Sequence, residues 1–172
     1  STKTMATSLH ERRQDDLIRD VGMHVAKDTE FYLAKGFRVA AVEANPELAR
    51  SVSHRLAAPI QEGRLRIFNV AICEKDGPIS FFRNRDKSDW GTISPELAAR
   101  NERLGTSNDR IEVDGWQFER VLDQTGIPYY AKIDIEGVPV LYLPYLSFPL
   151  NNDRQSGFLA PKLGFDSASG LD

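Results

Sequence analysis

The sequence predicts an α/β fold built on a parallel sheet of the doubly wound kind. Short apolar segments typical of strands alternate with helix-like segments from residue 17 to residue 137, which is the pattern of strand–helix–strand units. Asp20 and Gly22 form a turn between the first strand and a helix, and such a turn presents backbone N–H groups to a ligand. Glu43 ends the next strand, where nucleotide-binding folds of this class contact ribose hydroxyls.

Turn and cap residues bound the predicted elements. Gly36 ends a helix, and the pairs Asn45-Pro46 and Ser94-Pro95 each place a cap before a proline at the first helical position. The strand at 79–82 follows the turn Asp76-Gly77-Pro78 and is expected to be antiparallel. In chain order we predict a helix at 4–16, a strand at 17–21, a helix at 28–35, a strand at 38–43, a helix from 46 to about 56, strands at 65–73 and 79–82, a loop at 87–92, a short helix from 94, a strand at 110–113, a helix at 116–124 and a strand at 129–135.

Composition excludes several classes of partner. The 172 residues have the length of one domain, and 22 basic against 25 acidic residues leave no electrostatic footprint for nucleic acid or an anionic membrane. No segment reaches the about 18–20 consecutive apolar residues of a membrane helix, and residues 1–16 lack the apolar core of a signal peptide. The single cysteine cannot form an internal disulfide. We therefore expect a cytoplasmic protein with no nucleic acid partner and no membrane span.

Four polar residues fall at the carboxyl ends of predicted strands, namely Asp20, Glu43, Asn69 and Asp134. Right-handed crossovers bring the carboxyl ends of parallel strands to one edge of the sheet, and ligands bind outside that edge. The sequence therefore predicts a ligand site there. Because the three histidines are dispersed and there is one cysteine, no metal-ligand spacing is present and we expect no metal.

Each of these residues also has a purely structural interpretation. Asp20 can cap a turn, Glu43 can be a solvated acid at a strand end, and a loop histidine such as His24 is more often a hydrogen-bonded spectator than a catalyst. Asp134 lies on one side of its strand with Lys132, so a plain ion pair is an alternative to a reactive site. A glycine turn with a spaced acid also suits a nicotinamide dinucleotide enzyme, although the Gly-x-Gly-x-x-Gly spacing is absent.

Five segments follow one another in the chain: Asp20-Val-Gly-Met-His, Val-Glu43-Ala-Asn-Pro46, Asn69-Val-Ala71-Ile, Ser88-Asp-Trp-Gly-Thr92 and Lys132-Ile-Asp134-Ile-Glu136-Gly137. In this order they resemble the FkbM-type methyltransferases over about residues 17–137, and the last segment is the most specific. The resemblance implies a Rossmann-like methyltransferase sheet. It also implies S-adenosylmethionine as the methyl donor, usually for O-methylation of a small-molecule, sugar or lipid hydroxyl.

The resemblance also implies a role for each matched residue. Asp20 and Gly22 would hold the methionine end of the cofactor, with Met23 and His24 as further cofactor-binding residues of the same turn. Glu43 would accept hydrogen bonds from the ribose hydroxyls, and Asn69 and Ala71 would lie near the adenine. Asp134 and Glu136 would be the catalytic pair, since a carboxylate at the reacting edge can act as a base on an acceptor hydroxyl.

Two residues depart from the family pattern. Ala26 stands where the family has glycine, and a positive φ there would cost alanine about 1 kcal/mol or more. Its methyl group would also crowd the cofactor, so Ala26→Gly is expected to improve cofactor binding. Arg19 stands in the first strand where an apolar residue is expected, and an unpaired guanidinium there would cost several kcal/mol.

The last part of the chain departs from the methyltransferase family. Residues 138–172 begin with a segment broken by Pro139, Pro144 and Pro149, and about 35 residues there resemble a segment of LptD, the outer-membrane protein of lipopolysaccharide assembly. We therefore predict an incomplete Rossmann-like methyltransferase domain at 1–137, with weak or no activity, and an irregular Pro-rich tail at 138–172. A natural fusion, a gene-model error and an artificial chimera all remain open as its origin. The exposed sheet edge before the tail also suggests self-association.

The resemblance to LptD supports a different class of function. In this alternative the chain is a non-catalytic binding or assembly module related to outer-membrane lipopolysaccharide assembly, with the tail as its working part. Binding of S-adenosylhomocysteine or of NAD would discriminate among the three functions.

Overall fold

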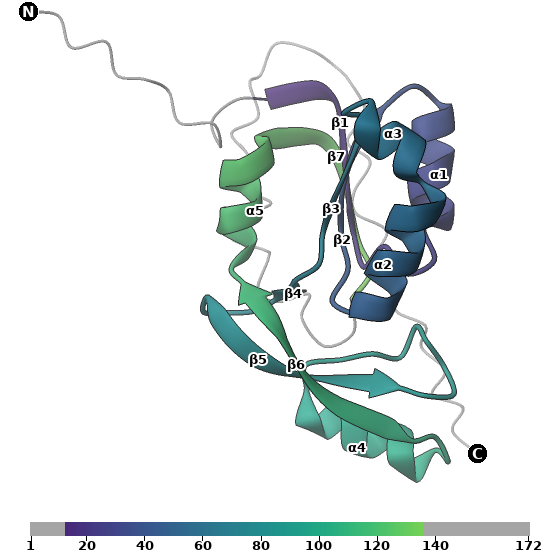
Figure 1. Cartoon of the computed structure of the whole chain (residues 1–172). Coiled ribbons are helices and arrows are strands. Elements are labelled where there is room, and N and C mark those ends of the chain that lie inside the picture. Colours follow the sequence, from purple (N-terminus) through teal and green to yellow (C-terminus); the bar gives the residue numbers. More distant parts are fainter. Residues whose placement is uncertain (1–12, 136–172) are drawn as a thin grey trace, which may run out of the picture.

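The computed structural model describes residues 13–135, which form a main parallel sheet and a smaller second sheet (Figure 1). The elements in chain order are β1 (Arg13–Val21), α1 (Lys27–Ala34), β2 (Arg38–Val42), α2 (Pro46–Arg55), α3 (Ala57–Gln61), β3 (Leu65–Phe68), β4 (Ala71–Ile72), β5 (Gly77–Asn84), α4 (Pro95–Arg103), β6 (Asn108–Trp116), α5 (Phe118–Thr125) and β7 (Ile127–Ile133).

The main sheet has the strand order β3-β2-β1-β7, and every neighbouring pair is parallel. Figure 1 shows α1, α2 and α3 on one face of this sheet and α5 on the other. The predicted α/β class with a Rossmann-like parallel sheet is thereby confirmed. Parallel strands joined by helices place all four carboxyl ends at one edge, which lies beside β4 in Figure 1.

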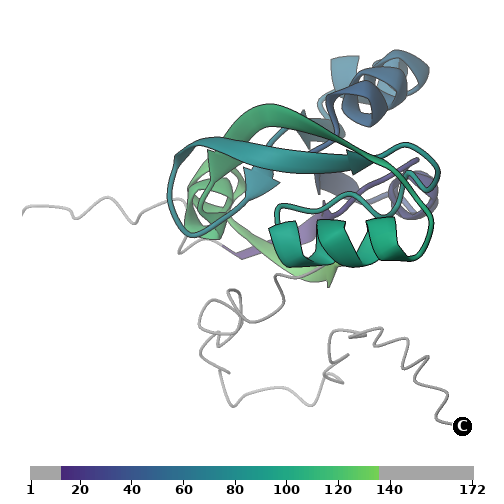
Figure 2. The ribbon, with the colours of Figure 1, turned by 90° about the horizontal axis from the view of Figure 1, so that it is seen from below.

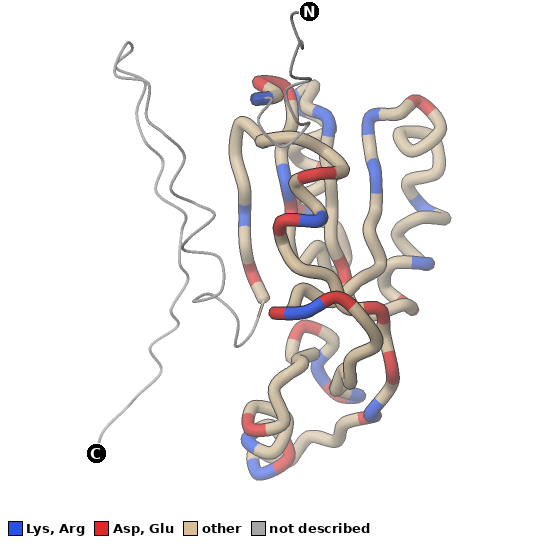
Figure 3. The backbone as a smooth tube through the Cα atoms, turned by 90° about the vertical axis from the view of Figure 1, so that its left-hand side faces the viewer, with Lys and Arg blue, Asp and Glu red and all other residues tan. Residues whose placement is uncertain are grey.

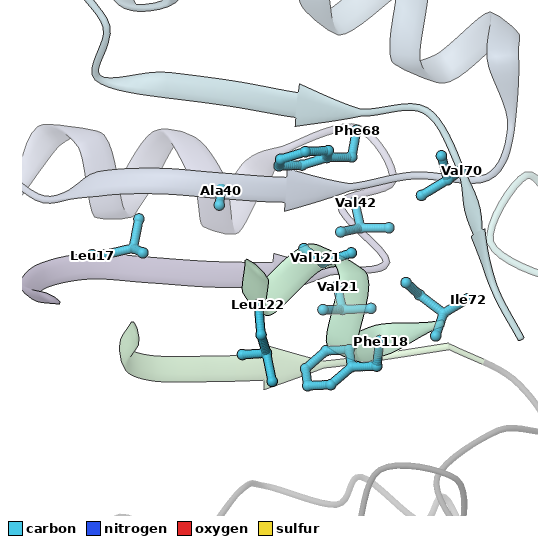
Figure 4. Close-up of a cluster of buried hydrophobic side chains, with 10 residues drawn as sticks. All are labelled: Leu17, Val21, Ala40, Val42, Phe68, Val70, Ile72, Phe118, Val121 and Leu122. Carbon is cyan, nitrogen blue, oxygen red and sulfur yellow. The ribbon is translucent and has the colours of Figure 1, made fainter. Parts of the chain in front are cut away.

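The two faces of the main sheet bury different residues of the same strands. Successive residues of a strand point to opposite faces, and the apolar segments of β1 and β2 therefore serve both layers. Figure 4 shows the cluster on the α5 side, which consists of Leu17, Val21, Ala40, Val42, Phe68, Val70, Ile72, Phe118, Val121 and Leu122. The cluster on the side of α1 and α2 consists of Met23, Ala26, Leu33, Val39, Ala41, Val52 and Leu65. Phe118, Val121 and Leu122 share one buried face of α5, as their spacing predicts.

The second sheet has the order β4-β6-β5 and lies below the carboxyl edge of the main sheet in Figure 1. β5 and β6 pair antiparallel over eight residue pairs, from Gly77↔Gly115 to Asn84↔Asn108, which confirms the expected antiparallel strand. Figure 2, seen from below, shows α4 lying along this antiparallel pair. The N-cap of α4 is Ser94, whose Oγ accepts a hydrogen bond from the Leu97 N–H at 3.2 Å, as predicted.

The single strand predicted at 65–73 is wrong, because the chain forms two strands that belong to different sheets. β3 pairs with β2 in the main sheet, whereas β4 pairs with β6 in the second sheet. Asn69 lies at the break and donates from Nδ2 to the carbonyl oxygens of Glu43 (2.8 Å) and Ala44 (3.3 Å). The Asn69 side chain thus binds the backbone just past the end of β2. The pairing of β3 with β2 ends at Phe68, and the chain continues into the second sheet.

The helix predicted at 4–16 is wrong for residues 13–16, which form the first part of β1; the other residues of that range lie outside the described part. Arg13 and Gln14 pair with the start of β7, and Arg38 of β2 donates to Asp16 at 2.6 Å and 2.7 Å and to Gln14 at 3.1 Å. Strand pairing with β7 on one side and the side-chain bonds of Arg38 on the other override the helix-compatible local composition. The remaining predicted elements are present with shifted ends, and β7 begins two residues earlier than expected.

Basic and acidic positions are interspersed along the described backbone, as Figure 3 shows. This distribution agrees with the nearly balanced composition of 22 basic and 25 acidic residues. No helix in the described part of the chain is both long enough and apolar enough to cross a membrane. The predictions for residues 138–172, including the Pro-rich tail, lie outside the described residues.

Candidate functional site

The turn after β1 packs directly against the segment that follows β7. The N–H groups of Gly22 and Met23 both donate to the carbonyl oxygen of Val42 at 3.0 Å, and Asp134 N donates to the Val21 carbonyl at 2.8 Å. Gly22 has φ +82°, and a Cβ on it would lie 2.0 Å from the Asp134 carbonyl oxygen. Glycine is therefore required at position 22 by the close approach of two backbones, whatever its role toward a ligand.

Asp20 is fully buried at the end of β1. Its Oδ2 accepts a hydrogen bond from Thr29 Oγ1 at 2.7 Å, and its Oδ1 lies 3.4 Å from Lys132 Nζ. Burial raises the pKa of Asp20 above its usual range, and the charge of Lys132 and the hydrogen bond from Thr29 partly offset that rise. Asp20 therefore belongs to a charge network that links β1, α1 and β7.

Glu43 follows β2 and is 8% exposed. Its Oε1 accepts from the Asn45 N–H and its Oε2 from the His24 N–H, each at 2.8 Å. Burial raises the pKa of the Glu43 carboxyl, and these two backbone donors lower it. A carboxylate accepts about four hydrogen bonds, so both oxygens retain capacity for a diol such as that of ribose. These acceptor oxygens fit the ribose hydroxyls of the predicted cofactor.

His24 and Met23 play different parts in the turn. Met23 is buried in the cluster beneath α1 and α2, so its side chain packs in the core. The prediction that Met23 contacts the cofactor stays a prediction. His24 has φ 53°, and its Nε2 lies 2.7 Å from Ser88 Oγ in the loop after β5. His24 thus connects the glycine turn, through Ser88, to the second sheet.

Asn69 and Ala71 lie past the carboxyl end of β3, two residues apart. The amide of Asn69 is bound to the backbone after β2, and the methyl group of Ala71 is buried at the start of β4. Asn69 therefore contacts the segment that carries Glu43, whereas Ala71 pairs with Gly115 of β6. Contact of either residue with an adenine stays a prediction.

Asp134 immediately follows β7, and its side chain is 79% exposed. Its Oδ2 lies 3.8 Å from Lys132 Nζ, which makes the predicted ion pair a weak one. Glu136, the other predicted catalytic carboxylate, lies outside the described residues. The carboxyl edge brings together the residues that the strand pattern predicts there, namely Asp20, Glu43, Asn69 and Asp134. The sequence did not predict the contacts that Thr29, Asp28 and Ser88 make with Asp20, Lys132 and His24, because no local pattern marks them.

Both departures from the family pattern have structural counterparts. Ala26 has φ 65° and ψ 28°, so it adopts the left-handed conformation for which glycine is favoured. Its methyl group is buried in the cluster beneath α1, so it packs in the core and does not crowd a ligand at the edge. The predicted strain is present, and the predicted crowding is wrong.

Arg19 is fully buried within β1, and its Nη2 donates to the Gly126 carbonyl at 2.9 Å and to Thr125 Oγ1. Its guanidinium carbon lies 5.4 Å from the centre of the Phe118 ring. Nε and Nη1 have no hydrogen-bond partner within the described residues. The charge of Arg19 is therefore only partly compensated by hydrogen bonds within the described residues.

A polar pocket of about 280 Å³ adjoins the edge between α2 and the second sheet, lined by Asn45, Glu47, Leu48, Arg83, Asn84, Arg85, Ser88 and Asp109. Arg83 pairs with Glu47 of α2 and, at 2.9 Å, with Asp109 of β6. Two guanidinium groups thus face two carboxylates, and the pocket presents both donors and acceptors. No cluster of metal-binding side chains occurs among residues 13–135.

Comparison with known proteins identifies two similarities. The family described as "Methyltransferase FkbM domain" matches residues 20–138. LPS-assembly proteins LptD are also similar: that of Cupriavidus necator is 36% identical over 96 residues, covering 53% of this chain and 11% of that protein. That of Legionella pneumophila (strain Lens) is 55% identical over 47 residues, which cover 27% of this chain and 6% of that protein. That of Ralstonia nicotianae is 28% identical over 173 residues, which cover 94% of this chain and 20% of that protein. The chain thus spans a fifth or less of these relatives, and no solved structure matches.

Proposed function

The chain belongs to the family of FkbM methyltransferase domains, and from that premise we propose that it binds S-adenosylmethionine and methylates a hydroxyl group. The cofactor would lie along the carboxyl edge of β1, β2 and β3. Asp20 and the glycine turn would face its methionine end, Glu43 its ribose, and the segment from Asn69 to Ala71 its adenine. The cofactor supplies an already activated methyl group, so the protein need only bind and orient the two reactants.

The observation that carries this proposal is the burial of the Glu43 carboxylate and its two hydrogen bonds to backbone N–H groups. A buried acid at the end of the second strand is held by two backbone N–H groups, one from the glycine turn and one from the start of α2. Its carboxylate is thereby oriented at the edge where the turn and the strand ends meet. This arrangement supports recognition of a vicinal diol, because hydroxyl groups donate to an ionised carboxylate strongly.

The acceptor hydroxyl would lose its proton at the same edge. Asp134 is exposed next to the glycine turn, and it is our candidate for the general base, together with Glu136. The polar pocket beside α2 supports a sugar or another polyhydroxylated acceptor, because its balanced guanidinium and carboxylate groups suit hydroxyls that both donate and accept.

Calorimetry on the whole chain tests cofactor binding. We expect S-adenosylhomocysteine to bind and NAD not to bind. Glu43→Ala should weaken S-adenosylhomocysteine binding by roughly 1.5–3 kcal/mol, the value of hydrogen bonds to a charged group. Glu119→Ala, which removes an exposed acid from α5, is the matched control and should leave the dissociation constant unchanged. An equal dissociation constant for Glu43→Ala and the unaltered chain would remove Glu43 from the site.

A second candidate function is a non-catalytic module of lipopolysaccharide assembly. The similarity to LptD proteins supports it, and those proteins are named for that process. The folded chain would then bind vesicles that contain lipopolysaccharide and ignore S-adenosylhomocysteine. The opposite pattern in the same two assays supports the methyltransferase.

A further inference from the structure

The polar pocket of about 280 Å³ between α2 and the second sheet adjoins both segments of the candidate site. Asn45 in its wall donates its backbone N–H to Glu43 Oε1 at 2.8 Å, and Ser88 Oγ lies 2.7 Å from His24 Nε2. Glu43 follows β2 and His24 follows β1, so the pocket lies beside the carboxyl edge of the main sheet. Its lining residues are distinct from those that the proposed cofactor contacts use.

Asn45 carries a side-chain donor that the fold does not use. The residue is 5% exposed, and its Oδ1 caps α2 by accepting from the Glu47 N–H at 3.1 Å. Its Nδ2 donates to no residue in the part of the chain that the structure describes. A nearly buried amide without a partner costs free energy, which a ligand in the pocket would recover. Capping α2 requires only the oxygen, so the free nitrogen indicates recognition of a hydrogen-bond acceptor.

The charged side chains of the pocket are already paired with one another. Arg83 binds Glu47 and, at 2.9 Å, Asp109, and Arg85 donates from Nε to the same Asp109 at 2.8 Å. The hydrogen bonds from Arg85 and Arg83 lower the pKa of Asp109 to about 2, so Asp109 stays ionised at neutral pH.

The lining therefore has two guanidinium groups, two carboxylates and no net charge. An anionic or cationic ligand would have to break one of the pairs to be neutralised. A neutral hydroxyl can donate to a carboxylate and accept from a guanidinium while both stay paired. Leu48 adds an apolar contact, which suits the C–H groups of a sugar ring.

Resting on the proposed function, we propose that this pocket binds an uncharged sugar, the hydroxyl acceptor of the proposed reaction, and that Asn45 Nδ2 donates to an oxygen of that sugar. Sugars that carry a phosphate or a carboxylate are disfavoured by the paired charges. In the competing interpretation Asn45 only caps α2, and the arginines only join α2 to the second sheet. A cap has no preference among sugars, and serine provides it about as well as asparagine.

Titrations of the whole chain followed by nuclear magnetic resonance test the charge preference. The probes are the methyl glycosides of glucose, galactose and mannose and, for each sugar, the uronic acid and the ester phosphorylated on the primary hydroxyl. We expect at least one methyl glycoside to bind, and the two charged forms of the same sugar to bind about tenfold more weakly or not at all. Equal or tighter binding of the charged forms overturns the inference, as does the absence of binding by all three methyl glycosides.

An exchange of helix caps tests the role of Asn45. Asn45→Ser keeps an oxygen that caps α2 and removes the amide donor, so it should weaken binding of the methyl glycoside about threefold to tenfold. Ser94→Asn, the reciprocal exchange at the cap of α4, is the matched control and should leave that affinity unchanged. A thermal unfolding midpoint accompanies each titration, and Asn45→Asp, which also keeps the cap, is the second variant should Asn45→Ser fail to fold. An unchanged affinity in a folded Asn45 variant overturns the assignment of the amide.

S-adenosylhomocysteine is titrated into the same samples to separate this inference from the proposed function. If S-adenosylhomocysteine binds and the methyl glycosides do not, the inference falls and the proposed function stands. If the methyl glycosides bind and S-adenosylhomocysteine does not, the proposed function falls, and the sugar loses its role as acceptor.

Discussion

Gly22 is the residue at which the two functional segments of the main sheet touch. Its missing side chain lets the turn after β1 approach the Asp134 carbonyl, and its φ of +82° lies in the region that glycine occupies without strain. The glycine that the sequence marks as a ligand-binding turn is thus also a packing requirement. The two roles can be separated by substitution.

We expect Gly22→Ala to lower the free energy of unfolding by about 2–5 kcal/mol. Left-handed strain contributes about 1–2 kcal/mol, and forcing a methyl group against backbone atoms contributes about 1–3 kcal/mol. Gly36→Ala is the matched control, since Gly36 has φ +89° but nothing within 4 Å of a new Cβ. Urea unfolding should show only the strain for Gly36→Ala. Equal losses for the two variants would mean that the contact with Asp134 is unimportant.

At Ala26 the substitution runs the other way, from alanine to glycine, because alanine already has the left-handed conformation there. Ala26→Gly should change the free energy of unfolding by less than about 1 kcal/mol. The relief of about 1–2 kcal/mol of strain is offset by about 0.8 kcal/mol for the buried methyl group and about 0.5–1 kcal/mol for the unfolded-state freedom of glycine. A gain above about 2 kcal/mol in urea unfolding would show that strain dominates.

Between elements, the contact of β1 with α5 depends on a charged residue. Arg19 binds the carboxyl end of α5 through Gly126 and Thr125, yet two of its nitrogens have no partner within the described residues. Burial lowers the pKa of Arg19 to about 10, which reflects the same desolvation. The contact orients α5 at a cost in stability.

Arg19→Met should raise the free energy of unfolding by about 1–3 kcal/mol. Replacing a buried, incompletely paired charge by an apolar side chain of similar length is often neutral or stabilising, and the two lost hydrogen bonds each offset about 1 kcal/mol of the gain. Arg66→Met, an exposed arginine over Phe68, is the control and should change little. A loss above about 1 kcal/mol for Arg19→Met in urea unfolding would contradict this account.

The carboxyl edge as a whole should give cofactor binding a distinct pH dependence. Burial raises the pKa of both Asp20 and Glu43, so both protonate at a higher pH than exposed carboxyls do. Since the ionised forms accept the cofactor's hydrogen bonds, affinity for S-adenosylhomocysteine should begin to fall, as the pH is lowered, in a range where exposed carboxyls are still ionised. Calorimetry across this range measures it.

The same shifts act on stability in the opposite direction. A carboxyl whose pKa is raised in the folded state binds more protons there, so its contribution to stability is fully present below the unfolded pKa and is lost as pH rises through the folded pKa. Asp20 and Glu43 should therefore bind cofactor better, and stabilise the fold less, as pH rises. An affinity that is flat down to the range of exposed carboxyls would show that neither residue must be ionised to bind.

At the scale of the whole molecule, β7 is one of the two outer strands of the main sheet within the described residues. Its outer edge carries backbone groups without a strand partner there. Tyr129 of β7 is 56% exposed and stacks on Phe37 at 6.0 Å, and Phe31 on α1 is 57% exposed. The next apolar segment, residues 138–150, lies outside the described part.

The outer edge of β7 predicts self-association of the chain. A dimer in sedimentation analysis would indicate that a second chain covers the edge.

Much of the fold could be predicted from the sequence because it depends on neighbours along the chain. The helix starts at Asn45 and Ser94 follow from local caps, and the apolar face of α5 from helical spacing. The gathering of Asp20, Glu43 and Asn69 at one edge follows from parallel strand topology alone. These features need no knowledge of which distant residues meet.

Only the tertiary structure decided the features that depend on contacts far apart in sequence. Lys132 meets Asp20 across 112 residues, and Arg19 meets Thr125 across 106, because β7 closes against β1. The extension of β1 to Arg13 and the division of residues 65–73 between two sheets likewise depend on which strands are available as partners. Composition and periodicity describe what a segment can form, and the pairing of the strands selects which charges are buried together.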